Sequence, residues 1–117
     1  MLGNETVERV YLATGNTDMR RSIDGLAAIV KLQFGMDPFE PSMFVFCNRA
    51  RDRLKILRWD HNGFWLYYRR LERGTFQWPE HGATVTQLSM REFRWLLDGL
   101  SPIQIQAHQA VTARVII

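Results

Sequence analysis

The sequence predicts one α+β domain in which an antiparallel β-meander of about four to five strands packs with two main α-helices. The 117 residues are enough for one ordinary domain with its own core. Apolar and polar residues alternate between turn signals over residues 43–79, and helical periodicity precedes and follows this stretch. Residues 1–102 form the predicted domain, and residues 103–117 form either one added strand or a loose, divergent tail.

The chain begins with a short strand followed by a helix. We expect the strand at residues 10–12, after which Thr17 or Asp18 offers an oxygen to cap the helix. Over residues 19–34, apolar side chains recur every three or four positions, which is the repeat of an amphipathic helix. The members of this stripe are Met19, Ile23, Leu26, Val30 and Phe34.

Glycines and prolines mark the end of this helix and the loop after it. Gly35 is placed to end the helix, and Pro38 and Pro41 predict an ordered loop leading into the meander. Gly25 lies inside the helix, where glycine costs about 1 kcal/mol relative to alanine. Either another backbone comes close to Gly25 or the helix simply tolerates this cost.

The meander is predicted from consecutive short runs that turn signals separate. These runs are Phe44-Val45-Phe46, Leu54-Lys55-Ile56 and Phe64-Trp65-Leu66. Short polar segments at residues 48–52, 60–63 and 72–74 are the predicted turns. In the second turn, Asn62-Gly63 is expected to supply the positive φ of a tight hairpin.

The second helix has a clear start signal in the sequence. Ser89 and Glu92 have the spacing of a capping box, and Leu88 and Phe93 occupy the two positions of a hydrophobic staple. Gly99 is placed to end the helix. These features predict a helix between Ser89 and Gly99, after the meander.

Positive charge is concentrated in the meander. Residues 43–79 carry eight basic and three acidic side chains, although the whole chain has a net charge of only +3. Guanidinium groups bind phosphates and interleaved aromatic rings stack on bases, so this pattern is typical of nucleic-acid contact. The alternative is the solvated face of an ordinary sheet above an aromatic core. The predicted nucleic-acid-binding residues are Arg49, Arg51, Arg53, Lys55, Arg58, Arg69, Arg70 and Arg73.

The sequence predicts no catalytic residue, metal or cofactor. The histidines lack the i, i+4 spacing of a helical metal pair, and they are His61, His81 and His108. The aspartates that could in principle hold metal ions share no motif, and they are Asp18, Asp24, Asp60 and Asp98. Cys47 lies in an apolar run, where a core position is expected rather than a nucleophile.

The sequence also predicts a cytoplasmic protein without membrane contact. No apolar run is long enough to cross a bilayer, and residues 1–16 lack the features of a signal peptide. The one cysteine, Cys47, cannot form an internal disulfide, which fits a reducing compartment.

Three sequence blocks resemble the TnpB (Orf2-like) accessory-protein family of the insertion-sequence sixty-six transposable elements. They are TDMRRSIDGLA from Thr17, the block FVFCNRARDRLKILRWDHNGFWLYYRRLERGTFQWP from Phe44 to Pro79, and WLLDGL from Trp95 to Leu100. The resemblance covers about residues 10–100 in the family's order and spacing. It implies an accessory factor of transposition, encoded beside a separate, larger transposase that carries the catalytic carboxylates.

Our leading hypothesis is therefore a non-catalytic binding module that contacts DNA at element ends through its basic hairpins, with Arg49, Arg51 and Arg53 as the first choice. The alternative is a protein interaction module that docks on the transposase through Trp65, Tyr67 and Tyr68, where bulky residues occupy both strand faces. A further expectation is a homo-oligomer in which a second copy of the chain helps to cover the sheet. A stand-alone nuclease would instead need Asp24 or Asp60 for metal-dependent cutting.

Overall fold

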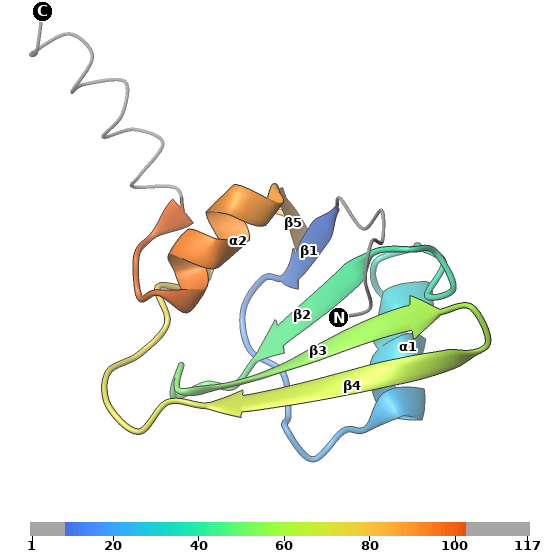
Figure 1. Ribbon diagram of the computed structural model, residues 1–117, viewed down its shortest axis with the longest axis horizontal. Coiled ribbons are helices and arrows are strands. Elements are labelled where there is room, and N and C mark those ends of the chain that lie inside the picture. The colour runs from blue at the N-terminus through green and yellow to red at the C-terminus, as the bar shows by residue number, and fades with distance from the viewer. Residues whose placement is uncertain (1–8, 103–117) are drawn as a thin grey trace, which may run out of the picture.

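A five-stranded sheet with one helix on each face makes up the computed structural model, which describes residues 9–102 (Figure 1). It confirms the predicted single-domain α+β fold. In chain order the elements are β1 (Val10–Ala13), α1 (Ile23–Leu32), β2 (Met43–Cys47), β3 (Arg53–Asp60), β4 (Gly63–Arg70), β5 (Val85–Leu88) and α2 (Met90–Leu97). The expectation of an added strand or loose tail over residues 103–117, including His108, lies outside the described residues.

The strands lie in the order β4-β3-β2-β1-β5. The predicted meander is confirmed for β2, β3 and β4, which pair antiparallel, and β5 is antiparallel to β1. The sheet as a whole is mixed, because β1 and β2 are parallel. The chain returns through α1 between these two strands, and such a crossover brings the second strand in along the same direction as the first.

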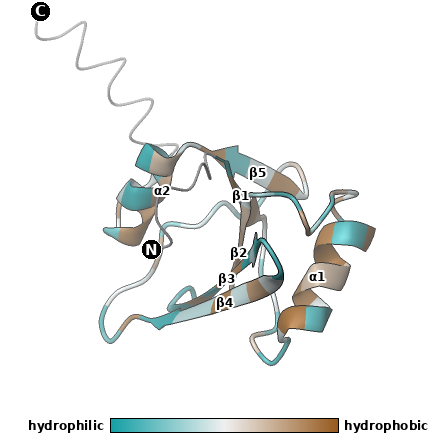
Figure 2. Ribbon diagram, turned by 45° about the vertical axis from the view of Figure 1, so that its right-hand side comes forward, coloured by the Kyte–Doolittle hydropathy of each residue, from teal (hydrophilic) through white to brown (hydrophobic). Residues whose placement is uncertain are grey.

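Strand alternation divides the core into two clusters on opposite faces of the sheet. In β2, Phe44 and Phe46 belong to the cluster beneath α1, whereas Val45 and Cys47 belong to the cluster beneath α2. All four side chains are completely buried. Figure 2 shows the two helices on opposite sides of the sheet. The central strand is therefore covered on both faces, as its continuous apolar run requires.

Helix α1 begins later than predicted, at Ile23 with Ser22 as its N-cap residue. The proposed caps are wrong because Asp18 instead accepts hydrogen bonds from the backbone and side chain of Arg20, which forms a turn ahead of the helix. Gly35 has φ 66° just after the helix, as expected for a terminating glycine. The atoms nearest to a Cβ built at Gly25 belong to the side chain of Arg21, from 3.3 Å, rather than to another backbone segment.

Helix α2 has the predicted capping box. The hydroxyl of Ser89 accepts from the Glu92 amide at 3.1 Å, and the Glu92 carboxylate accepts from the Ser89 amide at 2.8 Å. The staple residues Leu88 and Phe93 are both buried in the cluster beneath α2. The residues before Ser89 form the edge strand β5, which the sequence analysis did not predict.

The turns differ in two ways from expectation. In the turn between β3 and β4, positive φ is found at His61, with φ 59°, rather than at Asn62 or Gly63. After β4 the chain makes the predicted turn, with Gly74 at φ 76°, but no strand follows it directly. Residues 71–84 are instead an irregular connection whose Phe76 and Trp78 are buried under α2.

Candidate nucleic-acid interface

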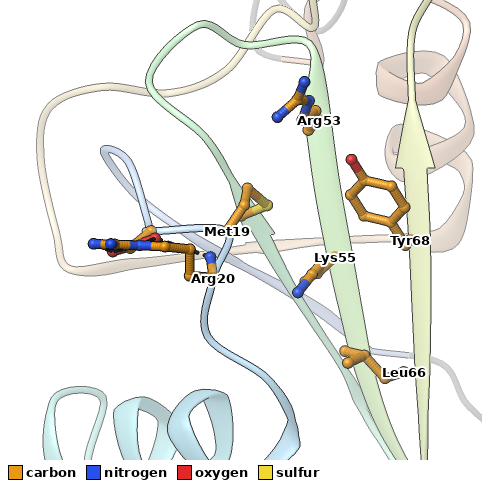
Figure 3. Close-up of a pocket in the computed structure, with 7 residues that line it drawn as sticks. Met19, Arg20, Arg53, Lys55, Leu66 and Tyr68 are labelled. Atoms are coloured by element: carbon orange, nitrogen blue, oxygen red, sulfur yellow. Dashed lines mark hydrogen bonds and ion pairs between the residues drawn. The ribbon is translucent and has the colours of Figure 1, made fainter.

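A groove of about 630 Å³ lies on the α1 side of the β3–β4 hairpin. Figure 3 shows that β3 and β4 supply one wall and the segment before α1 supplies the other. The residues lining it are Asp18, Met19, Arg20, Arg53, Lys55, Leu66 and Tyr68. We call this feature the basic groove, because three of its seven lining residues are cationic.

Two arginines face each other at the open end of the hairpin. Arg53 and Arg70 are directly paired across β3 and β4, and both are exposed. Like charges at opposed positions of an antiparallel pair destabilise the sheet. Glu72 relieves part of this repulsion, because its carboxylate accepts from Arg70 Nε at 3.0 Å, whereas Arg53 forms no ion pair with any described residue. An anion bound between the two guanidiniums would relieve the remainder.

The next cross-strand pair combines a cation with an aromatic ring. Lys55 is paired with Tyr68, and its ammonium lies 5.9 Å from the centre of the tyrosine ring. The same Nζ donates to the backbone carbonyl of Arg21 at 2.8 Å, so β3 is tied to the segment before α1. Tyr68 remains 54% exposed. The basic groove thus offers phosphate-binding cations beside an aromatic surface on which a base can stack.

The second wall carries a paired aspartate and arginine. Arg20 Nη2 donates to Asp18 Oδ2 at 2.7 Å, and this hydrogen bond is the main cause that lowers the pKa of Asp18 to about 2. The carboxylate is therefore charged throughout the physiological range, and its negative charge offsets that of Arg20. Sequence reasoning did not select Arg20 as a site residue, although the adjacent Arg20-Arg21 pair was a signal that could have found it.

Two of the predicted cations have structural roles. Arg51 has φ 63°, and its side chain is only 13% exposed. Its Nη1 donates to the Gly15 carbonyl at 2.7 Å, while its Nε lies 3.6 Å from a carboxylate oxygen of Glu80. Arg58 lies on the α2 side of β3 and is 2% exposed. Neither guanidinium is presented to the basic groove.

The remaining predicted arginines are exposed but dispersed. Arg49 lies in the turn before β3, and Arg73 lies in the turn after β4. Arg69 is paired with Leu54 and therefore projects to the α2 side of the hairpin. Alternation along the chain suggested that residues 49, 51 and 53 lie on one strand face or at the tip of the strand; Arg53 belongs to β3, and the other two lie in the turn before it. The structure brings together Arg53, Lys55 and Arg70.

The predicted interaction aromatics also divide between two faces. Trp65 and Tyr67 lie on the α2 side, with stacked rings 6.1 Å apart, whereas Tyr68 lies on the α1 side. Trp65 is 46% exposed, and its Nε1 donates to Asp60 at 3.1 Å. All three belong to β4, which forms one edge of the sheet.

Residues 9–102 contain no group of three or more histidine, cysteine or acidic side chains able to hold a metal ion. Cys47 is completely buried, and desolvation raises the pKa of its thiol to about 11. Its thiolate is therefore scarce at neutral pH, which agrees with the predicted core position. Within the same residues no helix is both long enough and apolar enough to cross a membrane.

Fold and groove together define a small α+β protein with a basic groove on one sheet face. The chain belongs to the family described as IS66 Orf2 like protein, whose model matches residues 8–107. This membership associates the protein with insertion sequences and confirms the resemblance found in its sequence blocks.

Two relatives from Sinorhizobium fredii (strain NBRC 101917 / NGR234) are similar along most of their length. The uncharacterized protein y4hO is 36% identical over 92 residues, which cover 79% of this chain and 80% of the relative. The uncharacterized protein y4jC is 35% identical over 100 residues, which cover 86% of each chain. No solved structure matches the chain.

Proposed function

We propose that this protein is a non-catalytic accessory factor of insertion-sequence transposition that contacts DNA at the ends of the element through the basic groove. The observation that carries the proposal is the exposed Arg53–Arg70 pair beside Tyr68, because opposed cations cost stability unless an anion bridges them. Family membership supports the link to transposition. Phosphate contacts by arginine give affinity for any sequence, and stacking on Tyr68 adds contact with a base.

The first test measures binding to labelled DNA from element ends and to scrambled DNA by fluorescence anisotropy over a range of salt. Replacing both Arg53 and Arg70 with alanine should weaken binding to both DNAs and make its salt dependence shallower, because fewer counterions are released. The matched control replaces Arg91 and Arg94, which are exposed on α2. This control removes the same charge far from the basic groove. Equal losses for the two double variants would contradict the assignment of the groove.

The exposed aromatic edge of β4 favours a second candidate function, which is docking on the transposase encoded by the element. Trp65 and Tyr68 are large, exposed rings on a strand with one free edge. Such surfaces are typical of protein interfaces. Capture of the transposase should survive nuclease treatment if docking is direct. Loss of capture after nuclease treatment would show that DNA bridges the two proteins.

A further inference from the structure

The two edges of the sheet differ in how well they are protected from pairing. Edge strand β5 has only four residues, and its Gln87 is exposed. Edge strand β4 has eight residues, contains no proline or lysine, and carries four aromatic side chains and one leucine along residues 64–68. Long apolar edges without such protection are templates for pairing with another strand. The only charged residues in β4 are Arg69 and Arg70, at its C-terminal end.

We propose that β4 pairs antiparallel with β4 of a second copy of this chain, centred on Leu66, to form a two-fold symmetric dimer. A two-fold axis perpendicular to the sheet requires opposed residues to project to the same face. With Leu66 opposite itself, Trp65 lies opposite Tyr67 of the second copy, and Phe64 lies opposite its Tyr68. Each pair occurs twice, so this register produces four aromatic cross-strand pairs. Shifting it to place Tyr67 opposite itself leaves only one such pair.

Charge also favours this register. Arg69 is placed opposite Gly63 of the second copy, which has no side chain to block it. Across the hairpin, Gly63 is paired with Asp60 on the same face as Arg69. The Arg69 guanidinium of one copy can therefore extend over Gly63 of the second copy toward the carboxylate of its Asp60. The arginine ends of the two strands lie at opposite ends of the interface, so they do not repel each other directly.

The dimer has a consequence for DNA contact that rests on the proposed function. The two-fold axis puts both basic grooves on one face of a continuous sheet. Strands about 4.8 Å apart that rise about 3.4 Å per residue place the two copies of Arg53 roughly 30 Å from each other. This spacing is close to one turn of duplex DNA, about 34 Å, so both grooves can reach the same side of one duplex.

Disulfide trapping tests the register without DNA. In the proposed dimer, Leu66→Cys places two thiols at directly opposed positions, within the Cα separation that a disulfide accepts. Tyr68→Cys is the control, because the two copies of residue 68 would be about 14 Å apart along the strands. Random collisions would instead favour position 68, where the side chain is more exposed than at Leu66. We expect rapid cross-linking at position 66 and little at position 68.

Light scattering and sedimentation of the protein alone test the dimer itself. Trp65→Lys should convert the dimer to a monomer with unchanged circular dichroism, because it adds a charge at the centre of the interface. Leu32→Lys is the matched control, since Leu32 is a 78% exposed apolar residue on α1 and should leave the dimer intact. A monomer at about 100 µM wild-type protein, or equal cross-linking at positions 66 and 68, would overturn the proposal. A monomer that still binds DNA would overturn the dimer and leave the proposed function standing.

Discussion

The inner strands β1 and β2 and the outer hairpin strand β4 differ in how they use their side chains. Residues such as Val10, Leu12 and Phe44 are completely buried between the helices. In β4 no residue is buried, and the strand carries exposed rings and two arginines. The inner strands therefore contribute most to the free energy of folding, whereas the outer strand keeps charged and aromatic groups exposed. Variants in the two regions should separate stability from binding.

The largest expected effect comes from Phe44→Ala in β2. Phe44 is completely buried, and its ring stacks on Tyr11 with 5.6 Å between centroids. Its loss should lower the free energy of unfolding by about 3–5 kcal/mol, through lost burial and the cavity left behind. Urea unfolding followed by circular dichroism measures this change. Tyr68→Ala, in β4, should lower the free energy of unfolding by less than about 1 kcal/mol. Equal losses of stability in the two variants would show that the inner strands and β4 do not differ in this way.

A smaller loss of stability is expected from Arg51→Ala. The variant removes the hydrogen bond to the Gly15 carbonyl and the contact with Glu80, and should lower the free energy of unfolding by about 1–3 kcal/mol. Arg51→Gly removes the same contacts but suits φ 63° better, so it should cost less than alanine. Neither variant should weaken DNA binding as much as the Arg53 and Arg70 double variant. The opposite ranking would show that Arg51 contacts DNA directly.

The smallest effect concerns the exposed pair on the second wall of the basic groove. Asp18 has its pKa lowered from 3.8 to about 2, chiefly by the hydrogen bond from Arg20. Because the folded-state pKa is depressed, the stabilisation is present above pH 3.8 and is lost as the pH falls through about 2. Carboxyl chemical shifts followed by NMR should show this low midpoint. In Arg20→Ala the midpoint should return toward 3.8, and an unchanged midpoint would exclude the pair in solution.

The sequence was sufficient to predict the elements whose signals lie within a few consecutive residues. Alternation identified β2, β3 and β4, and the spacing of Ser89 and Glu92 identified the start of α2, because both signals lie within a few residues. The start of α1 was misplaced because Asp18 bonds to Arg20 rather than to the first turn of the helix. The strand β5 was missed because its sequence, VTQL, does not alternate and its pairing with β1 is a long-range contact.

The candidate site was predicted as a set of eight basic residues in one region, without their arrangement in space. The concentration of arginine in residues 43–79 is visible in the sequence, but its division among the two sheet faces and the turns is not. Arg53 and Arg70 become neighbours through the β3–β4 register, and Arg20 joins them because the segment before α1 lies beside β3. No short sequence pattern specifies such contacts.

By itself, then, the sequence determined the α+β class, the meander, the cap of α2 and the basic character of the central stretch, because each follows from local periodicity, local hydrogen bonding or composition. Tertiary structure alone decided that β1 runs parallel to β2, that Arg51 is held inside the turn and that Arg53 faces Arg70. The physical reason is that strand direction, register and side-chain exposure depend on which segments distant in the chain cover one another. Those long-range contacts decide which charged and aromatic side chains remain exposed.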